Sequence, residues 1–158
     1  MSRLSPSPDA ACIIRQLTAA DAPSCRLFFR SLDREDIRLR FASLHRPLDA
    51  LASRAATGLA FGALDASGML LGIADLVDLP AGSAEVALAI RSDRKRRGLG
   101  RSLLAHAIRQ AEGRGLSLLL GYVLGENAAM LCLAREMGFR SRGWEGASIE
   151  VARPIGDH

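Results

Sequence analysis

Two glycines, Gly98 and Gly100, lie in a basic segment between a predicted strand and a predicted helix. Six positively charged residues fall within eleven positions there, namely Arg91, Arg94, Lys95, Arg96, Arg97 and Arg101. A glycine has no Cβ, so an anion can approach the backbone closely, and a turn at a helix start directs several N–H groups to one point. Arginine adds charge-assisted hydrogen bonds to phosphate. The segment therefore predicts a phosphate or pyrophosphate site; the alternative is a solvated basic turn.

The spacing of this segment differs from the two common nucleotide-binding loops. A Walker A loop has the pattern G-x-x-x-x-G-K-[ST], which the chain lacks. A dinucleotide-binding fingerprint has a third glycine where Leu103 stands, and it follows the first strand of its fold. The basic segment instead follows the fourth predicted strand. Neither an ATP or GTP hydrolase nor a dinucleotide-binding protein is predicted.

Hydrophobic periodicity predicts the elements that position this segment. Strands are expected at residues 13–17, 59–63, 69–77, 85–90, 118–124, 140–144 and 149–153. Helices are expected at about 18–32, 33–46, 98–113 and 127–138, with a short helical turn at 48–56. Thr18 and Asp21 have the spacing of a partial capping box at the first helix. This order of elements predicts one mixed α/β domain.

Length and composition limit the class of protein. A chain of 158 residues that is 49% hydrophobic is expected to form a single domain over residues 11–158, after a disordered tail at 1–10. It has no apolar run long enough for a membrane helix, and its first residues do not resemble a signal peptide. Cys12, Cys25 and Cys132 fit neither a disulfide framework nor a zinc spacing, and the histidines form no metal pattern. We expect a cytoplasmic protein with reduced core cysteines, no metal and no membrane partner.

The formal net charge of +4 raises the question of nucleic-acid binding. Aromatic residues, on which bases stack, make up only 4% of the chain. No standard nucleic-acid-binding motif is present either. Non-specific binding of phosphates by the arginines is therefore the weakest of the functional hypotheses.

The basic segment carries a resemblance to a known family. Lys95-x-x-Gly98-x-Gly100 resembles the [RQ]-x-x-G-x-[GA] pyrophosphate loop of the GNAT superfamily of acyl-CoA-dependent N-acyltransferases. Lysine replaces the usual arginine or glutamine and keeps a positive charge for the phosphate. The resemblance extends over about residues 13–151, and it implies a mixed, mostly antiparallel central sheet of six or seven strands flanked by about four helices.

Two further segments narrow the resemblance. Residues 36–41, Asp-Ile-Arg-Leu-Arg-Phe, and residues 126–139, which begin Glu-Asn-Ala-Ala-Met and end Met-Gly-Phe, are similar to the acetyltransferase domain of bacterial protein-lysine acetyltransferases. The resemblance then implies an N-acetyltransferase that uses acetyl-CoA as its acyl donor.

The resemblance also implies a set of acetyl-CoA contacts. The pantetheine arm would lie between splayed fourth and fifth strands, against backbone groups of Leu88, Ala89 and Ile90. The pyrophosphate would lie against the basic loop, formed by Lys95, Arg96, Arg97, Gly98, Leu99, Gly100 and Arg101. Asn127 would hydrogen-bond the pantetheine or an associated water; the alternative role is a plain helix cap.

Glu85 is the candidate catalytic residue, because the resemblance places a catalytic glutamate there. It begins the fourth predicted strand, on a face where the small Ala87 and Ala89 leave room for a substrate. About one lysine-like amine in a few thousand is neutral at neutral pH, so a proton acceptor should assist acyl transfer. A glutamate with its ordinary pKa of about 4.3 needs a raised pKa or a relaying water for this role. The alternative is an exposed charge at a strand end.

The proton donor to the leaving thiolate is not assigned. Many members of the superfamily have a tyrosine seven residues after the asparagine, where this chain has Ala134. The single tyrosine, Tyr122, falls on the fifth predicted strand and is expected to be structural. A thiol with a pKa of about 8.5 can leave as the thiolate without a dedicated acid. A backbone N–H near Leu88 or Ala89 is expected to stabilise the oxyanion.

Three hypotheses follow. The first is an acetyl-CoA-dependent N-acetyltransferase in which a primary amine, from a protein lysine or a small molecule, attacks directly in a ternary complex. The second is a catalytically inactive relative that binds acyl-CoA as a sensor or partner module. The third is the nucleic-acid-binding domain. A homodimer is expected by resemblance, and the acceptor pocket is expected near residues 29–44 and Trp144.

Overall fold

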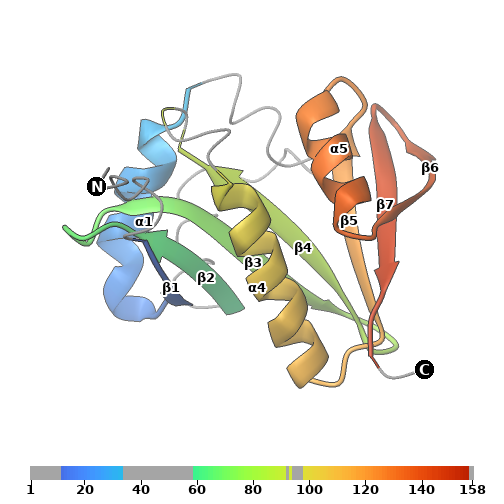
Figure 1. Ribbon diagram of the computed structural model, residues 1–158, viewed down its shortest axis with the longest axis horizontal. Coiled ribbons are helices and arrows are strands. Elements are labelled where there is room, and N and C mark those ends of the chain that lie inside the picture. Colours follow the sequence, from blue (N-terminus) through green and yellow to red (C-terminus); the bar gives the residue numbers. More distant parts are fainter. Residues whose placement is uncertain (1–11, 34–58, 92, 94–97, 157–158) are drawn as a thin grey trace, which may run out of the picture.

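Seven strands form one sheet in the order β1-β2-β3-β4-β5-β7-β6 (Figure 1). The computed structural model describes residues 12–33, 59–91, 93 and 98–156. The strands are β1 Ile13–Gln16, β2 Leu59–Leu64, β3 Leu70–Leu79, β4 Ser83–Ile90, β5 Leu118–Leu124, β6 Arg140–Glu145 and β7 Ser148–Pro154. The helices in the described ranges are the 3-10 helix η2 Ala19–Asp21 and the α-helices α1 Ala22–Ser31, α4 Leu99–Gly113 and α5 Ala128–Glu136.

The pairing confirms the predicted mixed, mostly antiparallel sheet. Five of the six neighbouring strand pairs are antiparallel, and only β4 and β5 run parallel. The described part of the chain contains three α-helices, one fewer than the number expected. The predicted helix at 33–46, apart from its first residue, and the predicted turn at 48–56 lie outside the described residues.

The fourth strand begins earlier than expected. Residues 80–82 form a tight turn in which Ala81 and Gly82 have positive φ angles of 64° and 72°. The turn brings Ser83 directly opposite Leu79 in the β3–β4 ladder. Glu85 is therefore the third residue of β4 rather than its first.

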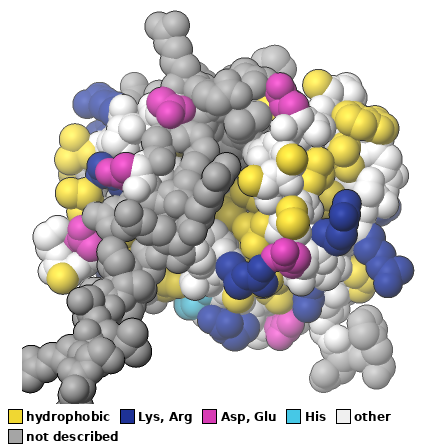
Figure 2. Space-filling view, turned by 45° about the horizontal axis from the view of Figure 1, so that its top comes forward, with side chains coloured by type: hydrophobic (Ala, Val, Ile, Leu, Met, Phe, Trp, Pro, Cys, Tyr) yellow, Lys and Arg dark blue, Asp and Glu magenta, His cyan; other side chains and the backbone are white. Residues whose placement is uncertain are grey.

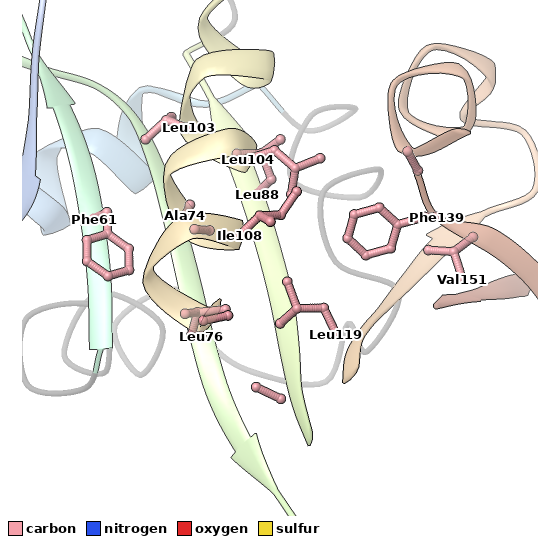
Figure 3. Close-up of a cluster of buried hydrophobic side chains, with 14 of the residues drawn as sticks. Phe61, Ala74, Leu76, Leu88, Leu103, Leu104, Ile108, Leu119, Phe139 and Val151 are labelled. Carbon is pink, nitrogen blue, oxygen red and sulfur yellow. The ribbon is translucent and has the colours of Figure 1, made fainter. Parts of the chain in front are cut away.

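Side-chain alternation gives the sheet two apolar faces. On one face, β2–β5 and β7 pack against α4 and α5 around Phe61, Leu103 and Leu119 (Figure 3). On the opposite face, Leu17, Ile73 and Ala89 pack against α1, whose buried side chains are Cys25, Phe28 and Phe29. The helices thus cover the two faces of the sheet separately, and both cores stabilise the position of β4.

The cysteines do not share one environment. Cys25 is buried in the core below α1 and Cys12 is half-buried, as expected of small core residues. Cys132 is exposed, so the expectation of a core role is wrong for it. It lies on α5, and its thiol donates to Glu136 one turn along the helix at 3.5 Å.

Candidate functional site

The parallel pair at the centre of the sheet separates after three residues. Ser83, Ala84 and Glu85 pair with Leu118, Leu119 and Leu120, and the ladder stops there. Both strands continue, β4 to Ile90 and β5 to Leu124. Backbone groups of a strand point alternately to its two sides. Beyond Glu85, the side of β4 that faces β5 therefore offers N–H and C=O groups to which no strand of the described chain is paired.

A pocket occupies the separation between the two strands. Its walls come from β4, β5, α4, α5 and β7, and it is lined by Glu85, Val86, Ala87, Leu88, Leu104, Gly121, Tyr122, Val123, Met130, Ala134, Phe139 and Val151. In Figure 3, Leu88 and Leu104 lie on one side of the separation, and Phe139 and Val151 lie on the other. Apolar side chains also gather in a hollow of the face that carries α4 and α5, with basic side chains on the surface beside it (Figure 2). An apolar pocket with a few polar groups is typical of a ligand site.

The N-terminus of α4 lies next to the end of β4. Gly98 is the N-cap residue, with a φ of +79° that favours glycine, and no side chain caps the helix. The first intrahelical bond runs from the N–H of Ser102 to the carbonyl of Gly98 at 3.0 Å. The N–H groups of the preceding turn therefore have no acceptor within the helix, at the positive end of its dipole. A Cβ at Gly98 would have no heavy atom of the described residues within 4 Å, which leaves room for an approaching anion.

Gly100 has a different environment from Gly98. A Cβ built there would lie 3.4 Å from Leu133 Cδ2 and 3.6 Å from Leu88 Cδ2, which are ordinary packing distances. The position is helical and faces α5 rather than open space. An alanine would fit, which gives a physical reason for a pattern that accepts either glycine or alanine.

The basic residues of the predicted pyrophosphate loop are described only in part. Lys95, Arg96 and Arg97 lie outside the described residues. The side chain of Arg101 forms an ion pair with Glu136 and contacts the sulfur of Met137 at 3.7 Å. This side chain therefore links α4 to α5. Leu99 is 3% exposed, so only its backbone is available to a ligand.

The three predicted pantetheine contacts on β4 differ in where their side chains lie. Leu88 lines the pocket. Ala89 packs into the α1 core on the opposite face, and half-buried Ile90 packs toward α4. Because the side chains of these three residues point to different faces of the sheet, a single ligand can contact all three only through their backbone groups. The resemblance in the sequence predicts backbone contacts of this kind.

Asn127 is the N-cap of α5. Its side-chain oxygen accepts a hydrogen bond from the N–H of Met130 at 3.1 Å. The helix-cap role foreseen for this residue is thus present in the structure. A contact of Asn127 with a ligand stays a prediction.

Glu85 and Tyr122 both line the pocket. Glu85 pairs with Leu120, two residues before Tyr122 on β5, so both side chains lie on one face of the sheet. Burial raises the pKa of the Tyr122 phenol above its ordinary value, and the nearby carboxylates of Glu150, Glu145 and Glu85 raise it further. The phenol therefore remains a hydrogen-bond donor at neutral pH. The sequence predicts a structural role for Tyr122, whereas the pairing of β5 with β4 and β7 places it at the pocket. Such pairing is not visible in the sequence.

Asp75 is a second residue that the sequence analysis did not single out. It is 9% exposed and lies opposite Ala87 in the β3–β4 ladder, which places it on the same face as Glu85. The available signal was one acidic residue in the centre of the apolar strand β3. A carboxylate is rarely buried in mid-strand without a structural or functional reason.

Neither a group of metal ligands nor a membrane-spanning helix is found among the described residues. Within those ranges, no three His, Cys, Asp or Glu side chains are grouped as a metal site requires. Each helix described is too short or too polar to cross a membrane.

Residues 21–139 match the family model described as the acetyltransferase (GNAT) family. The L-methionine sulfoximine/L-methionine sulfone acetyltransferase of Pseudomonas aeruginosa is 34% identical over 86 residues, which cover 51% of this chain and 50% of that protein. The [ribosomal protein bS18]-alanine N-acetyltransferase of Escherichia coli is 42% identical over 52 residues, 33% of this chain and 35% of that one. The chain thus matches half or less of the length of these curated relatives.

Solved structures match over most of the chain. The GNAT domain of S. lividans PAT superposes with a TM-score of 0.78 at 22% identity, covering 90% of this chain and 89% of that one. The PaiA N-acetyltransferase of Thermoplasma acidophilum, solved in complex with coenzyme A, has a TM-score of 0.74 at 18% identity and covers 91% and 99%. At these identities the structures establish a shared fold.

Proposed function

The chain belongs to the acetyltransferase (GNAT) family, and on this basis we propose that it transfers the acetyl group of acetyl-CoA to a primary amine. The observation that carries the proposal is the apolar pocket at the β4–β5 separation, which lies beside the uncapped N-terminus of α4. An elongated ligand matches this arrangement if its anionic group binds at the N-terminus of α4 and its apolar arm lies in the pocket. The similar fold of a protein solved with coenzyme A supports the same donor.

The residues present fit acetyl-CoA. The N–H groups of the first turn of α4, beginning at Gly98, would hold the pyrophosphate, and Lys95, Arg96, Arg97 and Arg101 would supply positive charge. Backbone groups of Leu88, Ala89 and Ile90 would bind the pantetheine amides along the unpaired side of β4. When bound, acetyl-CoA supplies a thioester carbonyl that is activated for attack by an amine.

Glu85 is proposed to receive the proton of the attacking amine. It is half-buried and lines the pocket next to Ala87, whose small side chain leaves space for the acceptor. The phenol of Tyr122 lies on the same face and can donate a hydrogen bond to a carboxylate or to the acceptor. A backbone N–H of β4 near Leu88 or Ala89 is proposed to stabilise the negative charge on the carbonyl oxygen.

The leaving thiolate has no tyrosine beside it at position 134. Ala134 lines the pocket and is 5% exposed. The pKa of a thiol, about 8.5, is low enough for the thiolate to leave and take a proton from water. Ala134 therefore leaves the proton donor to the thiolate unassigned. The second hypothesis, a chain that binds acyl-CoA without catalysis, corresponds instead to a Glu85 that does not act as a base.

The acceptor is proposed to be a primary amine, of a protein lysine or of a small molecule. The relatives are named for acetylation of a methionine analogue and of a ribosomal-protein alanine, so the family alone covers both kinds of acceptor. A cytoplasmic homodimer completes the proposal. Light scattering combined with size-exclusion chromatography tests the dimer.

Thermal unfolding with acetyl-CoA, CoA and ATP tests donor binding. A ligand at about one hundred times its dissociation constant adds roughly 2.7 kcal/mol to the free energy of unfolding. For a chain of this size, this corresponds to an increase in Tm of about 5–11 °C. We expect this increase with acetyl-CoA and CoA but not with ATP. No response to either CoA compound would overturn the proposal.

Acetylation of a panel of amines then separates an enzyme from an inactive binding module. Glu85→Gln is expected to lower kcat by about 10²–10⁴-fold while keeping the Tm increase with acetyl-CoA. Glu112→Gln, which removes an exposed carboxylate from the outer side of α4, is the matched control and should retain wild-type activity. Binding of acetyl-CoA with no acetylation of any amine would support the inactive module instead.

A further inference from the structure

Three carboxylates lie around Tyr122 on one face of the sheet, those of Glu85, Glu145 and Glu150. We call these four residues together the acidic face. Tyr122 pairs directly with Glu150 on β7. Glu145 on β6 pairs with Ser148, two residues before Glu150, and therefore points to the same side. Glu85 reaches this face from β4 through its pairing with Leu120. Four strands thus contribute polar side chains around Tyr122 on this face.

The strand pairings place these carboxylates near Tyr122, and their charges act on its phenol. After burial, the largest causes of its raised pKa are Glu150, Glu145 and Glu85, and Arg142 acts in the opposite direction. Among the described residues, three negative charges and one positive charge therefore act on the Tyr122 phenol, which lines the pocket. This local sign is opposite to the net charge of +4 of the whole chain.

The position of the acidic face relative to the pocket gives it a role. Glu85 and Tyr122 line the pocket, whereas Glu145 and Glu150 stand beyond them on the two C-terminal strands. We expect the part of an acceptor that lies beyond its reacting amine to contact the outer two carboxylates, because they stand beside Tyr122 on the same face as Glu85. Glu150 is half-buried, and charges that are partly removed from water interact more strongly than fully exposed ones.

We propose that the acidic face selects an acceptor amine with a second positive charge beside it, and that Glu145 and Glu150 determine this specificity. The inference rests on the proposed acetyl transfer and names the class of acceptor for the same pocket. A lysine or terminal amine in a basic peptide has this chemistry, and so does a polyamine. A free amino acid or amino-acid analogue has a carboxylate next to its amine, which the acidic face repels.

The test compares kcat/KM for four acceptors. They are a peptide whose lysine is flanked by arginines, the same peptide with flanking glutamates, spermidine, and L-methionine sulfone. We expect the wild-type chain to prefer the first and third, with a preference that shrinks as salt is raised. A comparison of the arginine-flanked peptide with spermidine distinguishes a protein acceptor from a small-molecule acceptor.

Glu145→Gln and Glu150→Gln are each expected to lower kcat/KM for the cationic acceptors roughly fivefold, which corresponds to about 1 kcal/mol for a partly exposed ion pair. The loss should appear in KM rather than kcat, since neither residue touches the reacting atoms. The glutamate-flanked peptide should be unaffected or improved. Glu112→Gln serves again as the control for loss of a carboxylate elsewhere, and the Tm increase with acetyl-CoA shows that each variant is folded.

The outcomes separate this inference from the proposed function. Equal or better acetylation of L-methionine sulfone or of the glutamate-flanked peptide overturns the specificity and leaves acetyl transfer standing. Binding of acetyl-CoA without acetylation of any cationic acceptor also overturns the specificity. Absence of both binding and acetylation overturns the proposed function together with it.

Discussion

Individual carboxylates in this chain occupy very different surroundings. Asp21 accepts two hydrogen bonds from the Arg15 guanidinium, both at 2.9 Å, and one from the N–H of Thr18 at 2.8 Å. Asp75 is buried in mid-strand, and Glu85 is half-buried at the pocket. The first arrangement stabilises the start of η2 and α1. Glu85, in contrast, lines the pocket, whereas Asp75 is buried on the same face of the sheet and does not line it.

Asp21 predicts a loss of stability in acid. The Arg15 hydrogen bonds, followed by the Thr18 N–H, lower its pKa to about 2 from 3.8. Its contribution to stability is therefore complete above pH 3.8 and is lost as the pH falls towards 2. Asp21→Asn is expected to lower the free energy of unfolding by about 1 kcal/mol at neutral pH, since Arg15 is largely solvated.

Urea unfolding between pH 6 and pH 2 measures this effect. The difference in stability between the wild type and Asp21→Asn should shrink as the pH falls below about 4. A difference that stays constant over the whole range would show that the carboxylate contributes through packing and not through its charge.

At the scale of elements, α4 connects the two halves of the site. Its N-terminus begins at the open glycine Gly98, and its buried stripe, which includes Leu103 and Ala107, packs on the sheet. His106 on the same helix lies edge-on to Phe61 of β2, with ring centroids 4.8 Å apart. The orientation of the proposed anion-binding end thus depends on packing along the whole helix.

Gly98→Ala is expected to destabilise the chain and weaken CoA binding. An alanine with a φ near +79° costs about 1–2 kcal/mol, although its Cβ meets no neighbouring atom. Gly100→Ala is the matched control for stability. It has a helical backbone and ordinary contacts, so it should be neutral or stabilising by up to about 1 kcal/mol. Thermal unfolding of both variants, with and without CoA, measures the difference; equal destabilisation would contradict the conformational argument.

His106 predicts a second pH effect, near neutrality. Burial lowers its pKa, and Arg109 lowers it further. The folded state therefore prefers the neutral ring, and the stability that this gives is present above pH 6.5 and is lost as the pH falls below it. His106→Phe keeps the ring contact with Phe61 and should remove this part of the pH dependence. The free energy of unfolding of both proteins is measured between pH 8 and pH 5. If it changes with pH equally in the wild type and in His106→Phe, His106 does not cause the pH dependence.

At the scale of the whole molecule, one sheet separates two cores. Phe61, Leu103 and Leu119 belong to the core below α4 and α5, whereas Leu17 and Phe28 belong to the core below α1. Strands β2, β3 and β4 contribute side chains to both, since their residues alternate between the faces. Loss of packing in the core on one face of the sheet should therefore also destabilise the core on the other face.

Leu103→Ala tests this coupling. The side chain is fully buried, so its truncation is expected to cost about 2–5 kcal/mol. The described cores should still unfold in one transition, with equal calorimetric and van't Hoff enthalpies. Leu27→Ala, at an α1 position that is 68% exposed, is the control and should change stability by less than about 0.5 kcal/mol. Two separate transitions in Leu103→Ala would show that the faces fold independently.

Local patterns in the sequence predicted most elements, and they located the N-terminus of α4, where we propose that the anion binds. The alternation at 118–124 and the helical period after Gly98 predicted β5 and α4, because such patterns depend only on neighbouring residues. The glycine at 98 also marked the helix start, since its φ of +79° favours glycine in any fold. Glu85 was found through its neighbours Ala87 and Ala89 and a family resemblance.

Only the tertiary structure decided how the strands are ordered and where the central pair separates. The placement of β7 between β5 and β6 brings Glu150 beside Tyr122, although the two are 28 positions apart in the chain. The β4–β5 ladder, limited to three pairs, brings Glu85 to the same face. Such long-range pairings depend on packing over the whole sheet, and no local pattern encodes them. Local sequence patterns therefore located the segments that we propose to carry the chemistry, and the fold brought Glu85 and Tyr122 together at the pocket.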